Sequence, residues 1–206
     1  SLAKGEIDFF MDAWLPLTHK NYLEKYGDNL EKLGVNYKDC RLGLVVPKYV
    51  DIKTIKDLNQ NPDNFKKRIV GIGISSGIMR QTNVAVDQYN LKLRVFPSSG
   101  PVMAKRLGIA YKNKEPIVVT GWKPHWKFAE YDLKLLNDPD KVYGKAENIF
   151  TVARKGFKKQ YPKLTKQLNN FILSDQQING LMKTIRNSGD AASGAKKWYK
   201  AHKNTL

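Results

Sequence analysis

Two segments of the chain each place a tryptophan shortly before a histidine, beside an apolar run. The pairs are Trp14 with His19 and Trp122 with His125. The faces of two indole rings attract a quaternary ammonium group through the ring quadrupole, an interaction worth about 2 kcal/mol or more once the cation is desolvated. A histidine beside such rings suits a carboxylate on the same ligand. A single tryptophan is more often a core residue, but two such pairs among four tryptophans favour a site for a small charged ligand.

A third segment offers backbone groups to an anion. The apolar run 68–74 is followed by Ser75 and Ser76, and a helix then begins at Gly77 and Ile78. The first N–H groups of a helix have no intrahelical partner, so they attract anions. The spacing Gly-x-Gly-x-x-x-Gly departs from the dinucleotide-binding fingerprint and lacks the Lys-Ser/Thr end of a P-loop, so we expect no nucleotide cofactor. An ordinary serine N-cap is the alternative interpretation.

The sequence lacks the patterns typical of enzymes and metal sites. His19, His125 and His202 show no His-x-x-x-His or Glu-x-x-His spacing, and no Gly-x-Ser-x-Gly motif occurs. The single cysteine, Cys40, excludes a disulfide within the chain, and we interpret it as a small packing residue. We therefore expect a protein that is not an enzyme and that holds neither a metal ion nor a cofactor.

Composition and charge describe a basic globular protein. Its 206 residues are 41% hydrophobic, and 36 Lys and Arg against 19 Asp and Glu give a formal net charge of +17. No apolar run reaches the roughly 18 residues that cross a bilayer. Such a surface attracts polyanions such as nucleic acid, anionic lipid headgroups or wall polymers. The lysines are scattered, so a basic nucleic-acid-binding module is an alternative that rests on charge without a motif.

The candidate residues need a scaffold, and the hydrophobic pattern predicts alternating strands and helices, which is an α/β fold. The predicted strands cover residues 7–11, 42–46, 68–74, 91–96, 116–119, 131–136 and 148–153. The predicted helices cover residues 18–33, 51–58, about 78–89 and 100–112, with three more helical pieces after residue 153. Gly34 is expected to end the first helix, and the expected N-caps lie at 98–101, Ser174 and Asp190.

The strands at 42–46 and 148–153 bracket a central block of the chain. We expect residues 1–47 and 148–206 to form lobe I and residues 48–147 to form lobe II. Two lobes joined by two crossing strands enclose a cleft, a usual place for a small ligand. The two tryptophan–histidine pairs are then expected to face each other across that cleft. Lobe I has few elements before residue 48, so we expect it to be incomplete at its N-terminus.

Several motifs follow one another over most of the chain. They are residues 12–16 (Asp-Ala-Trp-Leu-Pro), 43–50 (Gly-Leu-Val-Val-Pro-Lys-Tyr-Val), 77–79 (Gly-Ile-Met), 121–126 (Gly-Trp-Lys-Pro-His-Trp), 131–133, 142–144 and 153–157. With these motifs the chain resembles the substrate-binding proteins of glycine betaine and proline betaine ABC transporters, the OpuAC-like group. The resemblance implies a two-lobed periplasmic-binding-protein fold, type II-like, that closes on its ligand like a hinge. It also implies a tryptophan cage around a trimethylammonium group.

The resemblance also implies roles for individual residues. Trp14 and Trp122 match two walls of the cage, one from each lobe. His19 matches a carboxylate-binding histidine, and the amides of Gly77 and Ile78 complete the carboxylate site. The implied ligand-binding residues are therefore Trp14, His19, Gly77, Ile78, Trp122 and His125.

The function implied by the resemblance is that of a solute-binding protein. We expect it to bind glycine betaine, a compatible solute used in osmoprotection, and to deliver it to ABC permease subunits. It would act at the extracellular face of the cell membrane, lipid-anchored or fused to its permease, or in the periplasm. A receptor for choline, carnitine or proline betaine is the alternative within this class. The family's third cage tryptophan lies upstream of residue 1, and Trp198 looks like a packing residue of the last helix.

Overall fold

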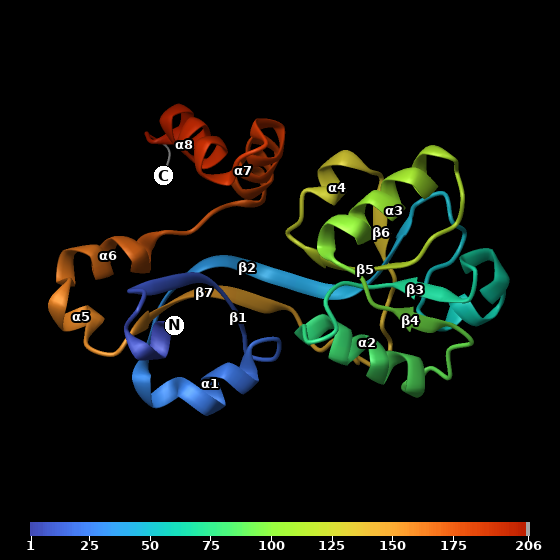
Figure 1. The fold of residues 1–206 in the computed structure, drawn as a ribbon, viewed down its shortest axis with the longest axis horizontal. Coiled ribbons are helices and arrows are strands. Elements are labelled where there is room, and N and C mark those ends of the chain that lie inside the picture. The colour runs from blue at the N-terminus through green and yellow to red at the C-terminus, as the bar shows by residue number, and fades with distance from the viewer. Residues whose placement is uncertain (205–206) are drawn as a thin grey trace. The chain divides into compact units, whose positions relative to one another are not determined.

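The computed structural model describes residues 1–204 and divides into two compact units. The first unit consists of Ser1–Cys40 and the chain from Ala146 onward, and the second is the continuous stretch Arg41–Lys145. Strands and helices alternate along the chain (Figure 1), which confirms the α/β class. The boundary between the first and second units lies within strand β2 (Leu30–Pro47), at Arg41, whereas we expected the second lobe to begin at residue 48. From Arg41 onward β2 pairs with strands of the second unit.

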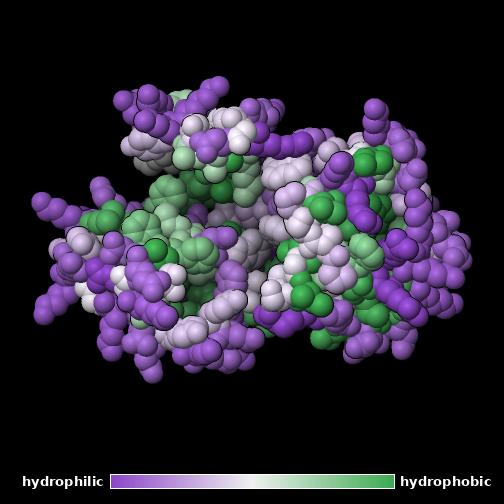
Figure 2. Space-filling view, in the orientation of Figure 1, coloured by the Kyte–Doolittle hydropathy of each residue, from purple (hydrophilic) through white to green (hydrophobic). Residues whose placement is uncertain are grey.

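The first unit contains a three-stranded antiparallel sheet. β7 (Glu147–Arg154) is the central strand, with β1 (Phe9–Leu15) on one side and the first part of β2 on the other. The helices of this unit are α1 (Lys20–Tyr26), α5 (Phe157–Gln160), α6 (Pro162–Asn170), α7 (Asp175–Ser188) and α8 (Ala191–His202). α5 and α6 pack on the sheet through a core made of Leu33, Ala153, Phe157 and Leu168. Hydrophobic residues are gathered over the sheet of this unit in Figure 2.

The last two helices pack against each other, and their starts are capped as predicted. Ser174 accepts a hydrogen bond from the Gln177 N–H in a complete capping box, and Asp190 accepts one from the Ser193 N–H. Trp198 is 5% exposed in α8 and stacks on His202 with 4.4 Å between ring centroids, so its interpretation as a packing residue is confirmed.

The second unit contains a mixed sheet. The second part of β2, then β5 (Val119–Lys123), β3 (Arg68–Val70) and β4 (Arg94–Phe96) lie side by side in this order, and β6 (Leu133–Leu135) pairs with β2 on its other side. β3 runs parallel to β4 and β5, whereas β2 is antiparallel to β5 and β6. The helices are α2 (Gly77–Gln88), α3 (Gly100–Lys112), which is capped by Ser99, and α4 (Lys127–Glu130).

The prediction of a helix over 18–33 is wrong in its second half. α1 ends at Tyr26, and β2 already begins at Leu30, where it pairs with Arg154 of β7. Gly34 is therefore a strand residue. A glycine is needed there because a Cβ would lie only 2.4 Å from the carbonyl oxygen of Asn169, at the end of α6. The predicted helix over 51–58 is also wrong, because only a short 3₁₀ turn at Lys56–Asn59 forms.

The other predicted elements exist with shifted ends. β1 and β5 lie further along the chain than the predicted strands, so Trp14 and Trp122 are strand residues. β3 ends at Val70, and residues 71–76 form the loop before α2. No helix within residues 1–204 is long and apolar enough to cross a membrane. Cys40 is fully buried, and burial, followed by the charge of Glu147, raises the pKa of its thiol to about 12, in keeping with a packing role.

Candidate functional site

In the first unit, the chain folds back on Trp14 within five residues. The Trp14 N–H donates to Nδ1 of His19 over 2.9 Å, and the Trp14 carbonyl accepts the His19 N–H over 3.0 Å. Because Nδ1 is an acceptor here, the neutral imidazole carries its proton on Nε2, which is then a donor. The loop thus fixes both the position of His19 beside Trp14 and the tautomer of its ring.

The indole ring of Trp14 is held at its edge by a carboxylate. Its Nε1–H donates to Oδ1 of Asp12 over 2.8 Å, and the tryptophan is 7% exposed. A hydrogen bond to a charged acceptor is stronger than one between neutral groups, so it restricts rotation of the ring. The acidic neighbour also favours positive charge nearby.

A buried glutamate from the far end of the sequence holds the same loop. Glu147, at the start of β7, is 2% exposed, and its Oε1 accepts the N–H groups of Leu17 at 2.6 Å and Thr18 at 2.9 Å. Its other oxygen accepts the Thr18 hydroxyl. Sequence reasoning missed Glu147. The available signal was an acidic residue directly before the apolar run 148–153, since a charged group that starts a buried strand needs partners.

In the second unit, Trp122 lies in β5, half-buried, and a histidine packs against its ring. The rings of Trp122 and His125 meet edge-on, with centroids 4.9 Å apart and an interplanar angle of 85°. The ring centroids of His125 and Trp126 lie 5.2 Å apart, and Nδ1 of His125 accepts the Lys127 N–H over 3.2 Å. Burial, together with the charge of Lys127, lowers the pKa of His125 to about 3, so this imidazole is neutral at physiological pH.

A lysine that sequence reasoning missed lies against the same tryptophan. Lys127 is 0% exposed, its Nζ is 4.7 Å from the ring centroid of Trp122, and its hydrogen bond to the Thr120 carbonyl is long, at 3.4 Å. No carboxylate within residues 1–204 forms an ion pair with it. Burial lowers the pKa of Lys127 to about 7. Nothing local in the sequence distinguishes it from the many surface lysines.

The start of α2 also lies in the second unit. Gly77 and Ile78 occupy its first turn, and the preceding Ser76 makes no side-chain capping bond to the helix. The Ser76 hydroxyl is buried and has no hydrogen-bond partner within residues 1–204. First-turn amides together with an unused hydroxyl can bind an anion. Ile78 belongs to the core cluster against which Trp122 packs, so the fold brings these two candidates to one cluster.

The structure therefore assembles the candidates in two groups. Trp14 and His19 lie together in the first unit, and Trp122, His125 and the start of α2 lie in the second. Within residues 1–204 no group of three or more His, Cys, Asp or Glu is placed to hold a metal ion. What the groups offer is aromatic faces, a histidine N–H donor and helix N–H groups, which can bind a ligand but do not form a catalytic arrangement.

Comparison with known families identifies the class of protein. Residues 1–201 match OpuAC, the substrate-binding domain of ABC-type glycine betaine transport systems. This match covers nearly the whole chain, and the chain belongs to this family. The resemblance seen in the motifs is thereby confirmed, as is the expectation that the protein is not an enzyme. The alternative of a nucleic-acid-binding module is not supported.

Individual relatives are similar over different lengths. The glycine betaine/carnitine transport binding protein GbuC of Listeria monocytogenes serotype 1/2a (strain 10403S) is 42% identical over 148 residues, which are 70% of this chain and 48% of that protein. The chain thus spans about half the length of this curated relative.

Solved structures show the same fold over nearly the full chain. The glycine betaine/L-proline-binding protein ProX of Borrelia burgdorferi is 34% identical with a TM-score of 0.89, over 98% of this chain and 78% of that one. Lactococcal OpuAC, in its closed conformation with glycine betaine, is 38% identical with a TM-score of 0.89, over 98% of this chain and 80% of that one. A choline-binding protein of an ABC transporter, in complex with choline, is 28% identical with a TM-score of 0.86, over 100% of this chain and 75% of that one. These matches confirm the two-lobed binding-protein fold.

Proposed function

We propose that the chain is the extracytoplasmic substrate-binding part of an ABC importer and that its ligand is glycine betaine. The observation that carries the proposal is the way both tryptophans are held: Trp14 by the carboxylate of Asp12, and Trp122 by the edge of His125. Rings that are fixed before binding lose little conformational freedom when they enclose a cation. The family, and relatives whose names include glycine betaine, support this ligand.

In this proposal the trimethylammonium group is bound by aromatic faces. Trp14 of the first unit and Trp122 of the second form walls of the cage, as the family motifs imply. A quaternary ammonium group has no N–H to donate, so ring faces suit it better than a carboxylate partner does. His125 contributes by holding Trp122, and because its pKa is about 3 it adds no positive charge beside the cation.

The carboxylate of the ligand is bound by hydrogen-bond donors. His19 presents Nε2–H, and the amides of Gly77 and Ile78 add the positive end of the α2 dipole. The unpartnered hydroxyl of Ser76 adds a further donor. A ligand that binds groups of both units stabilises the closed arrangement over the open one, and the closed form is the one recognised by the permease. The protein then acts in the periplasm or at the outer face of the membrane.

Calorimetric titration with glycine betaine tests the cage. Trp14→Ala and Trp122→Ala should each weaken binding by about 30-fold or more, the equivalent of roughly 2 kcal/mol for a desolvated cation–π contact. Trp198→Phe is the matched control, because that tryptophan packs in α8. A melting curve shows whether each variant is folded. Unchanged affinity in both folded alanine variants would refute the cage.

A choline receptor is the second candidate, favoured by the similarity to a choline-bound structure. Choline lacks a carboxylate, so the two ligands differ in their need for His19. His19→Gln should weaken glycine betaine binding by about tenfold, the loss of one hydrogen bond to a charged group, and leave choline binding nearly unchanged. Tighter binding of choline than of glycine betaine to the unmodified protein would favour the second candidate.

A further inference from the structure

A groove lined by cationic side chains lies at the edge of the sheet in the second unit. Its volume is about 530 Å³, and its lining residues are Lys66, Lys67, Arg68, Lys92, Arg94, Val95 and Phe96. β4 is the edge strand of this sheet and β3 is its neighbour. Figure 2 shows hydrophilic side chains along the end of the unit farthest to the right. No group of the proposed ligand site lines this groove.

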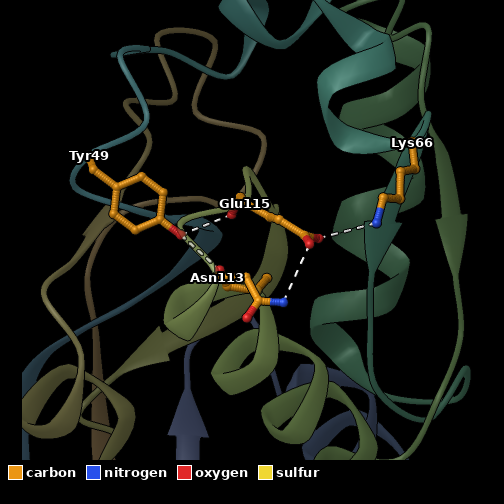
Figure 3. A network of polar contacts seen from close by, with 5 residues as sticks. Tyr49, Lys66, Asn113 and Glu115 are labelled. Atoms are coloured by element: carbon orange, nitrogen blue, oxygen red, sulfur yellow. Dashed lines mark hydrogen bonds and ion pairs between the residues drawn. The ribbon is translucent and has the colours of Figure 1, made fainter.

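Two of the lysines already have carboxylate partners. Lys66 pairs with Glu115 at 3.3 Å, and Glu115 also accepts a hydrogen bond from Asn113, as Figure 3 shows. Tyr49 donates to the Glu115 carbonyl over 2.9 Å, which fixes the backbone that carries this acid (Figure 3). Lys67 pairs with Asp63 at 3.2 Å. Among the described residues, no Asp or Glu lines the groove itself.

The remaining cations are arranged so that they repel one another. Arg68 and Arg94 are register partners in the parallel pair β3–β4, and Lys92 lines the same groove. None of the three forms an ion pair within residues 1–204. Like charges opposite each other on neighbouring strands are destabilising. A bound anion would remove this repulsion.

An arginine from α3, Arg106, contacts the aromatic residue that lines the groove. The guanidinium carbons of Arg68 and Arg106 lie 5.4 Å and 4.8 Å from the ring centroid of Phe96, the last residue of β4. The aromatic ring of Phe96 thus contacts two guanidinium groups. Guanidinium groups bind phosphate oxygens in a bidentate manner. The chemistry of the groove therefore fits a phosphate group and does not fit a neutral ligand.

We propose that this groove docks the protein on anionic phospholipid headgroups at the membrane surface. A domain of a membrane transport system works next to a bilayer, and anionic lipids present phosphates that attract Lys and Arg at about 1 kcal/mol each. Single-stranded nucleic acid is held by stacking of bases on aromatic rings, and the ring of Phe96, which lines the groove, already contacts two guanidinium groups. The docking is separate from ligand binding and goes beyond the proposed function.

Vesicle co-sedimentation of the full chain tests the proposal. The vesicles contain equal parts of phosphatidylglycerol and phosphatidylcholine, or phosphatidylcholine alone, in about 50 mM salt. Arg68→Gln/Arg94→Gln should weaken binding to the anionic vesicles about 25-fold, whereas Lys196→Gln/Lys197→Gln, which removes the same charge from exposed positions of α8, should change it less than about twofold. Lys92→Gln is the second groove variant and should weaken binding about fivefold.

The arms of the experiment separate the possible outcomes. Selective loss in the groove variants supports the proposal. Equal loss in the α8 control, or no binding to anionic vesicles, overturns it, because the attraction would then be diffuse or absent. Groove-dependent binding of a single-stranded oligonucleotide that is tighter than vesicle binding also overturns it. Release from vesicles by about 10 mM inorganic phosphate, at constant ionic strength, would show that a free phosphate fills the groove and would overturn the lipid assignment.

Discussion

The Nζ atom of Lys127 lies 4.7 Å from the ring centroid of Trp122, and the lysine side chain is completely buried. In its charged form this ammonium has the indole ring, a second ring at Phe128 (5.9 Å) and one long hydrogen bond for stabilisation. Its pKa of about 7 means that the charge changes within the physiological range. The tryptophan proposed to bind a cation thus already has a titrating cation beside it.

The first prediction concerns the pH dependence of ligand affinity. Glycine betaine keeps the same charge between pH 6 and 8, so a change in its affinity reports on the protein. Protonated Lys127 repels the ligand's cation, and at an effective dielectric constant of about 20 this amounts to roughly 1 kcal/mol after partial compensation by the ligand's carboxylate. Affinity should rise about fivefold from pH 6 to 8, and calorimetry of Lys127→Met should lack this component. Identical pH profiles for both proteins would contradict the prediction.

The second prediction concerns stability. The folded protein releases the Lys127 proton near pH 7, whereas an unfolded chain holds it up to about pH 10.4. Between these values the unfolded state binds more protons, so the free energy of unfolding rises with pH. From pH 7 to 9 the native protein should gain about 2 kcal/mol relative to Lys127→Met. Urea denaturation of both proteins at pH 7 and pH 9 measures this gain. If the free energy of unfolding of the unmodified protein does not rise relative to that of Lys127→Met, the lysine does not titrate as a buried group.

The third prediction concerns Glu147, whose carboxylate holds the loop before His19. Glu147→Ala removes a buried carboxylate and leaves the part-buried N–H groups of Leu17 and Thr18 without their acceptor, which should lower the free energy of unfolding by about 3 kcal/mol. Glycine betaine affinity should fall as well, because His19 is no longer fixed. Glu31→Ala is the matched control: Glu31 also accepts two backbone N–H groups in the first unit, but away from this loop. Glu31→Ala should lower the stability of the protein and leave its affinity for glycine betaine unchanged. Melting curves and calorimetric titrations of both variants test this.

The fourth prediction concerns close packing at Gly34. A Cβ at this position would lie 2.4 Å from the Asn169 carbonyl oxygen and 2.6 Å from its Cα, and backbone atoms cannot rotate away. Gly34→Ala should therefore destabilise the protein by about 2–4 kcal/mol. Gly27→Ala is the control, because nothing lies within 4 Å of its added Cβ and its φ is −55°. The control should be neutral or slightly stabilising in thermal unfolding, and equal melting temperatures for the two variants would exclude the clash.

Features that depend on local chemistry could be predicted from the sequence. The caps at Ser99, Ser174 and Asp190 were predictable because a side-chain acceptor acts within three residues of its own position. The α/β class followed from the alternation of apolar runs. The motifs around Trp14 and Trp122 indicated the family, because each keeps its residue types within a few positions.

Features that depend on distant contacts could not be predicted in this way. Residues 30–33 show helical spacing but join β2, because β7, more than a hundred residues later, provides their pairing partner. The same limit applies to Glu147 and Lys127. The role of the first comes from a loop 129 residues earlier in the chain, and that of the second from complete burial, which no neighbouring residue signals.

Strand order in the first unit has a consequence for biosynthesis. Its central strand, β7, begins at Glu147, whereas its outer strands, β1 and the part of β2 that ends at Cys40, come much earlier in the chain. On the ribosome the continuous segment Arg41–Lys145 can complete its fold first, while β1 and the early part of β2 have emerged without the strand that joins them. During that interval the nascent chain presents open strand edges, which are the surfaces that chaperones shield from aggregation.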